Sequence, residues 1–198
     1  TEATVLASYG GSDSFNLPFV HETILKALSK RKDLYFVFMN FAPFAQHERL
    51  IFLPGNSDIS YKMKFINTAD GMIHARGIGE SFGLACGEFS IKNKPVMTYA
   101  MSPQRSHIEI LGDKALLYKG KADLESLLLR FNRGVQNEKN WDAYSEKFSP
   151  QAVMPKFDSV FIKGPDFDPK SIGPLDKLAI EGYRFKRKIR NLSKKWYL

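Results

Sequence analysis

The sequence is poor in cysteine and has no long apolar run. Its single cysteine, Cys86, cannot form a disulfide within the chain, and a zinc site built from several cysteines is excluded as well. Such sparing use of cysteine fits a reducing compartment, so we expect a cytoplasmic location. No apolar run approaches the roughly 18 to 20 residues that a membrane-spanning helix needs. The sequence therefore contains no segment that predicts a membrane span.

Internal repeats and low-complexity tracts are also missing, and the composition is that of a folded domain. Of the 198 residues, 43% are hydrophobic and 25% are charged. This length suits one domain, or one domain with an appendage, and is enough to bury a core. The sequence begins with Thr1 and enters a strand-like run almost at once. We therefore expect it to be a piece of a longer protein.

Positive charge is concentrated at one end of the chain. The formal net charge is +8, and residues 151–198 hold eleven Lys and Arg against five Asp and Glu. The first 150 residues are therefore close to neutral. The basic character belongs to the C-terminal segment and says little about the ligand of the main domain.

Short apolar runs alternate with longer segments of helical period. The runs are rich in β-branched and aromatic residues and mostly lack polar alternation, as expected of a parallel sheet covered on both faces. They lie at residues 4–9, 34–40, 50–54, 71–75, 95–100 and 115–119. The helical segments lie at residues 17–31, 58–69, 82–93, 106–112 and 122–132. This alternation predicts an α/β fold with an open, Rossmann-like parallel sheet and helices on both faces.

After residue 132 the strand pattern stops. We expect helices at 141–148 and 150–162, the second with Ser149 as its cap and Pro150 in its first turn. Residues 163–174 contain three prolines and two glycines, which is typical of a linker. A final basic helix should follow, with apolar positions in steps of three and four at Leu175, Leu178, Gly182, Phe185, Ile189, Leu192 and Trp196. The predicted organisation is a main domain at 1–162, then a linker and amphipathic helix at 163–198.

The stretch HARGIGESFGLACGEF (74–89) carries the strongest functional signal. It comprises the end of the fourth predicted strand, a loop, and a helix from about residue 82, and ligands of open α/β sheets bind at such loops. The helix start and the loop glycines suit a phosphate, because backbone N–H groups can approach it closely. Glu80 and Glu88 would repel a phosphate but can accept hydrogen bonds from hydroxyls. A nucleotide sugar offers both kinds of group.

With the strand before it and KNKPVMTY (92–99) after it, this stretch resembles the E-x7-E signature of family 4 (group 1) retaining glycosyltransferases of the GT-B fold. The resemblance covers roughly residues 4–162 and implies the C-terminal, nucleotide-sugar-binding half of such an enzyme. It implies sugar transfer from a nucleoside diphosphate sugar to a glycan or lipid-linked acceptor, with retained anomeric configuration and no metal ion or cofactor. An N-terminal domain of the parent enzyme would bind the acceptor, so this chain alone should bind donor and catalyse little.

The resemblance also implies roles for individual residues. Glu80 would hold hydroxyls of the donor sugar as the catalytic residue, and Glu88 would bind the ribose diol. Backbone amides that would hold a phosphate belong to Phe82, Gly83 and Leu84. The turn after the first strand would approach the donor through Gly10, Gly11 and Ser12.

Two segments depart from the family pattern. SYGGSDSF (8–15) lacks the arginine and lysine that usually follow the first strand and neutralise the diphosphate. Their replacements would be Arg76 with Lys62 or Lys64. In SPQRSHIEILGD (102–113) the family often has a Gly-rich turn and another glutamate. Side chains that could line the site there are Gln104, Arg105 and His107. Base selection is expected near residues 53–60.

Other readings of the sequence remain open or are excluded. A dinucleotide-binding oxidoreductase or epimerase domain would need G-x-G-x-x-G after the first strand, and GGSDSF lacks it. The D-x-D of residues 166–168, a metal site in GT-A enzymes, falls in the predicted linker. A catalytically silent module that recognises a glycan or a protein stays open, because the usual cations are missing. The basic terminal helix could touch a membrane surface or pack on another domain, and we expect no nucleic-acid partner.

Overall fold

The structure, a computed structural model, describes residues 3–162, 164, 173–175, 177–178 and 181–182. The chain divides into two compact units, Thr1–Ser149 and Pro150–Leu198. The first unit therefore ends before the predicted domain boundary at residue 162, and the helix predicted at 150–162 belongs to the second unit. Each unit is described by itself.

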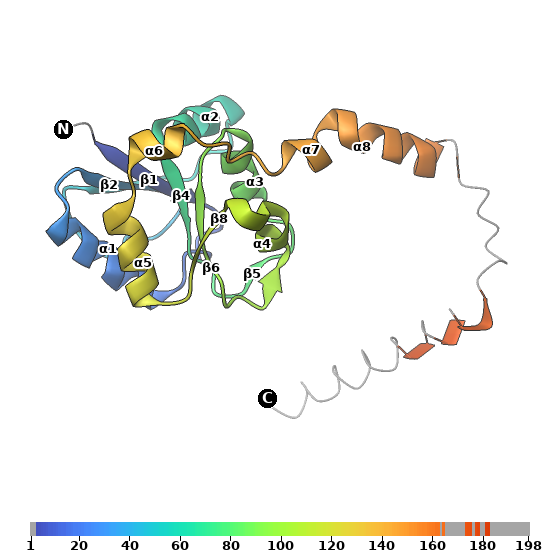
Figure 1. The fold of residues 1–198 in the computed structure, drawn as a ribbon, viewed down its shortest axis with the longest axis horizontal. Coiled ribbons are helices and arrows are strands. Elements are labelled where there is room, and N and C mark those ends of the chain that lie inside the picture. Colours follow the sequence, from blue (N-terminus) through green and yellow to red (C-terminus); the bar gives the residue numbers. More distant parts are fainter. Residues whose placement is uncertain (1–2, 163, 165–172, 176, 179–180, 183–198) are drawn as a thin grey trace. The chain divides into compact units, whose positions relative to one another are not determined.

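Six parallel strands form the central sheet of the first unit (Figure 1). They are β1 (Thr4–Tyr9), β2 (Leu34–Met39), β3 (Leu50–Leu53), β4 (Gly71–His74), β6 (Val96–Tyr99) and β8 (Ala115–Tyr118). Their spatial order is β3-β2-β1-β4-β6-β8, and every neighbouring pair is parallel. This is the strand order of dinucleotide-binding Rossmann folds. The predicted α/β class and the six predicted strands are confirmed.

Helices cover both faces of this sheet. On one face α1 (Pro18–Lys30) and α5 (Lys121–Arg130) lie side by side (Figure 1). The other face carries α2 (Ile59–Thr68), α3 (Leu84–Ile91) and α4 (Ser106–Leu111), which is followed by a short 3-10 turn (Gly112–Lys114). All five helices lie where the sequence predicts them.

Alternate residues of each strand serve the two faces, which gives the molecule two cores. Leu6 and Ile73 join the core beneath α1 and α5, whereas their neighbours Ala7 and Met72 join the core beneath α2 and α3. Successive strand side chains point to opposite faces, so a strand buried on both sides must be apolar at every position. This explains why the apolar runs show no polar alternation.

An aromatic loop replaces a helix between β2 and β3. Parallel neighbours need a crossover, and most use a helix. Here residues 40–49 cross without one, and Phe44 stacks on the His21 ring of α1 with a centroid distance of 4.1 Å. Phe41 packs beside Phe15 at 5.4 Å. Buried aromatic area therefore stabilises the crossover, and it brings Phe41 to the carboxyl edge of the sheet.

Several short elements were not predicted. β5 (Gly79–Glu80) and β7 (Gln104–Arg105) form a parallel two-residue pair, and α6 (Arg133–Asn137) follows α5. The helix predicted at 141–148 is wrong in its first half, because α7 spans only Ser145–Phe148. The Asp142 carboxylate accepts hydrogen bonds from the Tyr144 and Ser145 amides at 3.1 and 3.0 Å, so the helical turn begins after it.

The second unit is described only in part. It contains α8 (Pro150–Phe157) and a π-helical turn (Asp158–Ile162), so the predicted start at Pro150 is confirmed. The predicted linker and the terminal basic helix lie largely outside the described residues. Among the residues that the structure describes, no helix is both long and apolar enough to cross a membrane.

Two arginines hydrogen-bond to the ends of helices at the amino edge of the sheet. The Arg31 guanidinium donates to the Leu128 and Phe131 carbonyls at the end of α5, both at 2.8 Å, and forms an ion pair with Asp33 at 2.6 Å. Arg49, only 6% exposed, donates to the Leu28 carbonyl at the end of α1 at 2.7 Å. These cations meet free carbonyls at the negative ends of two helix dipoles.

We expect Arg31→Met to destabilise the fold by about 2–4 kcal/mol. The substitution leaves the Leu128 and Phe131 carbonyls without a hydrogen-bond donor and leaves Asp33 without its cation. Urea denaturation followed by circular dichroism would measure the loss. Lys32→Met, at the exposed neighbouring position, removes the same charge and should change the midpoint little. Equal midpoints for the two variants would contradict a structural role for Arg31.

Candidate functional site

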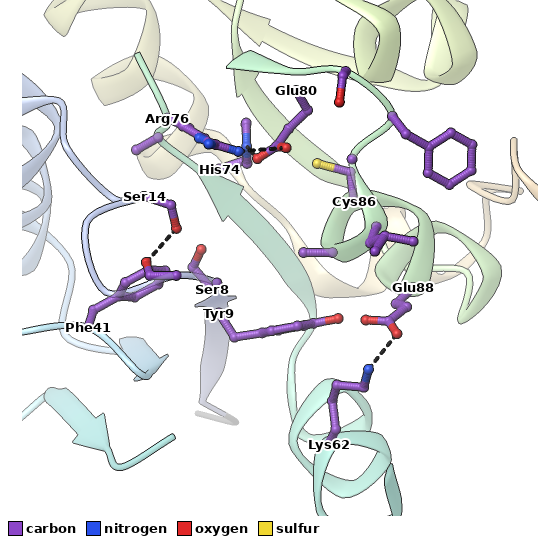
Figure 2. A pocket seen from close by; sticks show the side chains of 18 residues that line it. Ser8, Tyr9, Ser14, Phe41, Lys62, His74, Arg76, Glu80, Cys86 and Glu88 are labelled. Atoms are coloured by element: carbon purple, nitrogen blue, oxygen red, sulfur yellow. Dashed lines mark hydrogen bonds and ion pairs between the residues drawn. The ribbon is translucent and has the colours of Figure 1, made fainter. Parts of the chain in front are cut away.

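A cavity of about 460 Å³ lies at the carboxyl edge of the sheet, between the loops that follow β1 and β4. β1 lies between β2 and β4, so the chain leaves β1 toward α1 on one face and leaves β4 toward α3 on the other. Loops that diverge at such a switch in strand order leave a crevice between them. Figure 2 shows the side chains that line it, including Ser8, Tyr9, Phe41, Glu80 and Glu88.

Glu80 lies at one wall of the cavity and is held by its own loop. The Arg76 guanidinium donates to Oε2 at 2.9 Å, and His74 Nε2 lies 3.3 Å from Oε1. Burial alone would raise the pKa of the Glu80 carboxyl, but the hydrogen bonds from His74 and Arg76 bring its pKa below the usual value. Glu80 is therefore ionised near neutral pH, with both oxygens already oriented (Figure 2).

A buried hydrogen-bonded chain stands behind Glu80. The Thr98 hydroxyl lies 2.9 Å from both His74 Nδ1 and His107 Nε2. A hydroxyl has one proton, so it donates to one ring and accepts from the other. With the His74 Nε2–H donating to Glu80, the His74 Nδ1 accepts from the Thr98 hydroxyl and the His107 Nε2–H donates to it. His74 thus ends β4 with both ring nitrogens at hydrogen-bonding distance from a partner.

The N-terminus of α3, the helix that follows the Glu80 loop, faces the cavity. Gly83 caps α3 in the left-handed region with φ 82°, and a Cβ there would lie 2.7 Å from the His107 Cβ. The first intrahelical bond runs from the Gly87 amide to the Gly83 carbonyl at 2.8 Å, so the amides of residues 84–86 precede it. Among the described residues, no side chain caps this end of the helix. These amides and the positive end of the dipole can bind an anion.

Glu88 lies on the opposite wall and pairs with Lys62 from α2. The Lys62 Nζ is 2.5 Å from Glu88 Oε1, and the two side chains are 29% and 30% exposed. Burial raises the pKa of the Glu88 carboxyl, and the neighbouring ammonium opposes this effect. The Lys62 ammonium also lies 5.8 Å from the centre of the Tyr9 ring. The cavity therefore has one carboxylate on each wall, and each is compensated by a cation.

Most of the predicted site residues come together in this cavity. Those that line it are Gly10, Gly11, Lys62, Arg76, Glu80, Phe82, Gly83, Leu84 and Glu88. Ser12 does not, because it lies at the tip of its turn and borders a different hollow. Lys64 does not either. It follows Lys62 by two residues, or about 200° around a helix, and lines a hollow beside Val5 and Phe65.

The three residues proposed from the 102–113 segment do not line the cavity. Gln104 and Arg105 are exposed in β7, where their backbone pairs with Gly79 and Glu80. His107 is fully buried, and its Nε2 lies 2.9 Å from the Thr98 hydroxyl that also contacts His74. Cys86 is fully buried in the core, and burial raises the pKa of its thiol.

Sequence reasoning missed several residues of the cavity. Tyr9, Ser8 and Phe41 line it, and His74 supports Glu80. Ser8 and Tyr9 end a strand just before the glycines, so their position next to the loop was a usable signal. Phe41 had no such signal, because its loop is long and irregular. In the part of the chain that the structure describes, no cluster of three His, Cys, Asp or Glu side chains could hold a metal ion.

A solved structure of the same fold comes from a glycosyltransferase. The C-terminal domain of a group 1 family glycosyltransferase (LpcC) from Francisella tularensis superposes with a TM-score of 0.57 at 15% identity. The match covers 78% of this chain and 86% of that domain. This chain has the fold of the C-terminal half of a group 1 glycosyltransferase. The fold expected from the E-x7-E resemblance is thus confirmed.

Two longer glycosyltransferase-fold structures match in the same way. TarM from S. aureus superposes with a TM-score of 0.63 at 13% identity, over 79% of this chain and 35% of TarM. Anabaena HepE, solved with UDP and glucose, gives 0.56 at 15% identity, over 80% of this chain and 49% of HepE. The chain thus spans about a third to a half of these proteins. No protein-family model and no curated protein matches the sequence.

Because His107 is buried, we expect the unfolding free energy of the chain to fall in mild acid. Burial and the neighbouring His74 lower the pKa of His107 to about 4. The unfolded chain takes up this proton below about pH 6.5 and the folded chain does not, so stability falls as pH drops from about 6.5 to about 4. By pH 4.5 this one group should cost about 2 kcal/mol.

His107→Gln keeps a donor for Thr98 and removes the titrating ring. We expect a shallower decline in unfolding free energy between pH 7 and 4.5 than in the unsubstituted chain, measured by urea denaturation at each pH. The carboxylates titrate in both proteins and cancel in the comparison. Parallel pH profiles would show that His107 does not stay neutral in the fold.

Proposed function

We propose that the cavity binds a nucleoside diphosphate sugar and that the chain is the donor-binding half of a retaining glycosyltransferase. One observation carries this proposal. Glu80, Glu88 and the open N-terminus of α3 line a single cavity at the switch in strand order. The volume of about 460 Å³ lies within the range of small-ligand sites.

Each wall of the cavity suits one part of such a ligand. The diphosphate would lie at the amides of residues 84–86, and Arg76 stands at the same edge. The ribose diol would donate to Glu88, and hydroxyls of the sugar would donate to Glu80. An adjoining hollow of about 570 Å³ shares Tyr9, Gly10 and Lys62 with the cavity and extends to Asn56 and Ser57. We place the base there, beside the loop that was expected to select it.

The proposed reaction needs no nucleophile from this half. The bond between the anomeric carbon and the diphosphate oxygen breaks, and the acceptor oxygen bonds to the same face of that carbon. The acceptor proton passes to the leaving phosphate oxygen. Residues of this chain would position the donor and stabilise the negative charge that develops on the diphosphate. The acceptor, a glycan or a lipid-linked hydroxyl, would come from another domain of the parent enzyme.

A catalytically silent binding module is the second candidate. The turn after β1 carries Ser12 and Asp13 rather than cations, and both cations of the cavity are engaged by carboxylates. A chain that had lost diphosphate binding while keeping its fold would have these features. Affinity for nucleotides distinguishes the two functions.

Thermal unfolding with UDP, GDP, ADP and dTDP and their glucose conjugates tests the proposal. A ligand at a hundred times its dissociation constant stabilises the fold by about 2.7 kcal/mol, which is a visible shift. We expect one base to be preferred. Stabilisation by none of these compounds, from a folded chain, would favour the silent module.

Substitution of Glu88 and substitution of Glu80 should weaken the binding of different ligands. Glu88→Gln should weaken the preferred nucleoside diphosphate and its sugar conjugate alike, by about 10-fold or more, because both contain the ribose. Glu80→Gln should weaken only the sugar conjugate. Titration calorimetry measures both, with Glu109→Gln on the exposed side of α4 as the matched control. Identical losses for both glutamates would refute the separate roles.

A further inference from the structure

The Lys62–Glu88 ion pair joins two residues that the proposed donor site needs separately. Lys62 comes from α2 and Glu88 from α3, and their charged atoms meet at 2.5 Å at the cavity wall (Figure 2). The pair occupies the carboxylate that a ribose diol would have to reach. The ammonium that could neutralise a diphosphate is occupied as well.

The second glutamate of the cavity is held in a different way. Glu80 takes its two partners, His74 and Arg76, from the segment just before it, so its contacts are part of one rigid loop. Lys62 extends from α2 to Glu88 on α3 through a flexible four-carbon side chain. The two side chains are only 29% and 30% exposed, so each charge needs a new partner when the pair separates, and a diphosphate and a ribose diol would supply them. The contact with Lys62 is therefore the one that a ligand can exchange.

The Lys and Arg side chains that line the cavity are Lys62 and Arg76, and Arg76 is already bound to Glu80. Lys62 also lines the adjoining hollow with Tyr9 and Gly10, so it stands where ribose and diphosphate would meet. We infer that Lys62 exchanges partners when donor binds: it leaves Glu88 for the diphosphate, and Glu88 accepts the ribose diol. This inference rests on the proposed function and assigns to α2 the cation that the turn after β1 lacks.

The Tyr9 hydroxyl favours a second arrangement of the side chains at this wall, in which Lys62 has left Glu88. It is buried and has no hydrogen-bond partner among the described residues, which is a costly state for a hydroxyl. The ring is packed in place against Phe89, with centroids 6.0 Å apart, and points toward Glu88 in Figure 2. When Lys62 leaves, the hydroxyl can donate to the Glu88 carboxylate. The exchange therefore satisfies a group that the free protein leaves unpaired.

Lys62→Gln tests the exchange, because it has opposite effects on two ligands. Affinities of the 198-residue chain for UDP and uridine, or for the corresponding pair if another base is preferred, would be measured by titration calorimetry and ligand-observed NMR. Work at pH 8 keeps Glu88 ionised, since burial raises its pKa. We expect UDP affinity to fall by about tenfold or more, and uridine affinity to rise by about two- to fivefold.

Two further variants locate the effect. Lys64→Gln removes the same charge from the same helix but lies at another hollow, so both affinities should stay unchanged. In Glu88→Gln, the added Lys62→Gln substitution should no longer raise uridine affinity, because the competing carboxylate is gone. A circular dichroism melt of each variant confirms that it is folded.

The outcomes separate the inference from the proposed function. A uridine affinity that is unchanged or weaker in Lys62→Gln overturns the exchange, while UDP binding that depends on Glu88 keeps the donor site. If the unsubstituted chain binds none of the nucleotides or nucleosides, the proposed function fails and the exchange fails with it. A rise for uridine together with a fall for UDP supports both.

Discussion

Parallel pairing of β1 with β4 is the constraint on which the rest of this structure depends. The two strands share a short register, Leu6 opposite Gly71 and Ala7 opposite Met72, yet their following helices lie on opposite faces of the sheet. No crossover passes over the space between their carboxyl ends. A crevice therefore exists there for topological reasons, before any side chain is considered.

The side chains that line the crevice meet two electrostatic requirements of the proposed ligand. A ligand with hydroxyls on both sides of a diphosphate needs carboxylates near its ends and positive potential between them. Glu80 and Glu88 stand on opposite walls, each beside a cation, so neither carries an uncompensated charge toward a diphosphate. The open end of α3 supplies positive potential through amides that no side chain caps. The cavity thus combines the charges that the proposed donor would require, with cations that come from α2 and from the loop after β4.

Stability and binding are divided between the two edges of the sheet. At the amino edge, Arg31 and Arg49 bind the carbonyls that end α5 and α1, and these contacts hold helices against strands. At the carboxyl edge, within the part of the chain that the structure describes, the loops carry glycines and an uncapped helix start, and Tyr9 at the end of β1 has a hydroxyl without a hydrogen-bond partner. The arginine contacts that stabilise the fold are therefore separate from the groups that face the cavity.

The sequence by itself determined the strands, the main helices and the E-x7-E loop, because these follow from local rules. Apolar runs without alternation predict buried strands, and a helix that starts after a glycine loop places Glu88 about a turn and a half beyond Gly83. Only the tertiary structure decided which side chains meet. Lys62 and Lys64 are equivalent in the sequence, and the face of α2 that meets α3 selects Lys62. His107 likewise became a buried support of Glu80 only because β6 lies beside β4 and presents Thr98 to His74. Such pairings depend on strand order and helix facing, and these are set by packing between segments far apart in the chain.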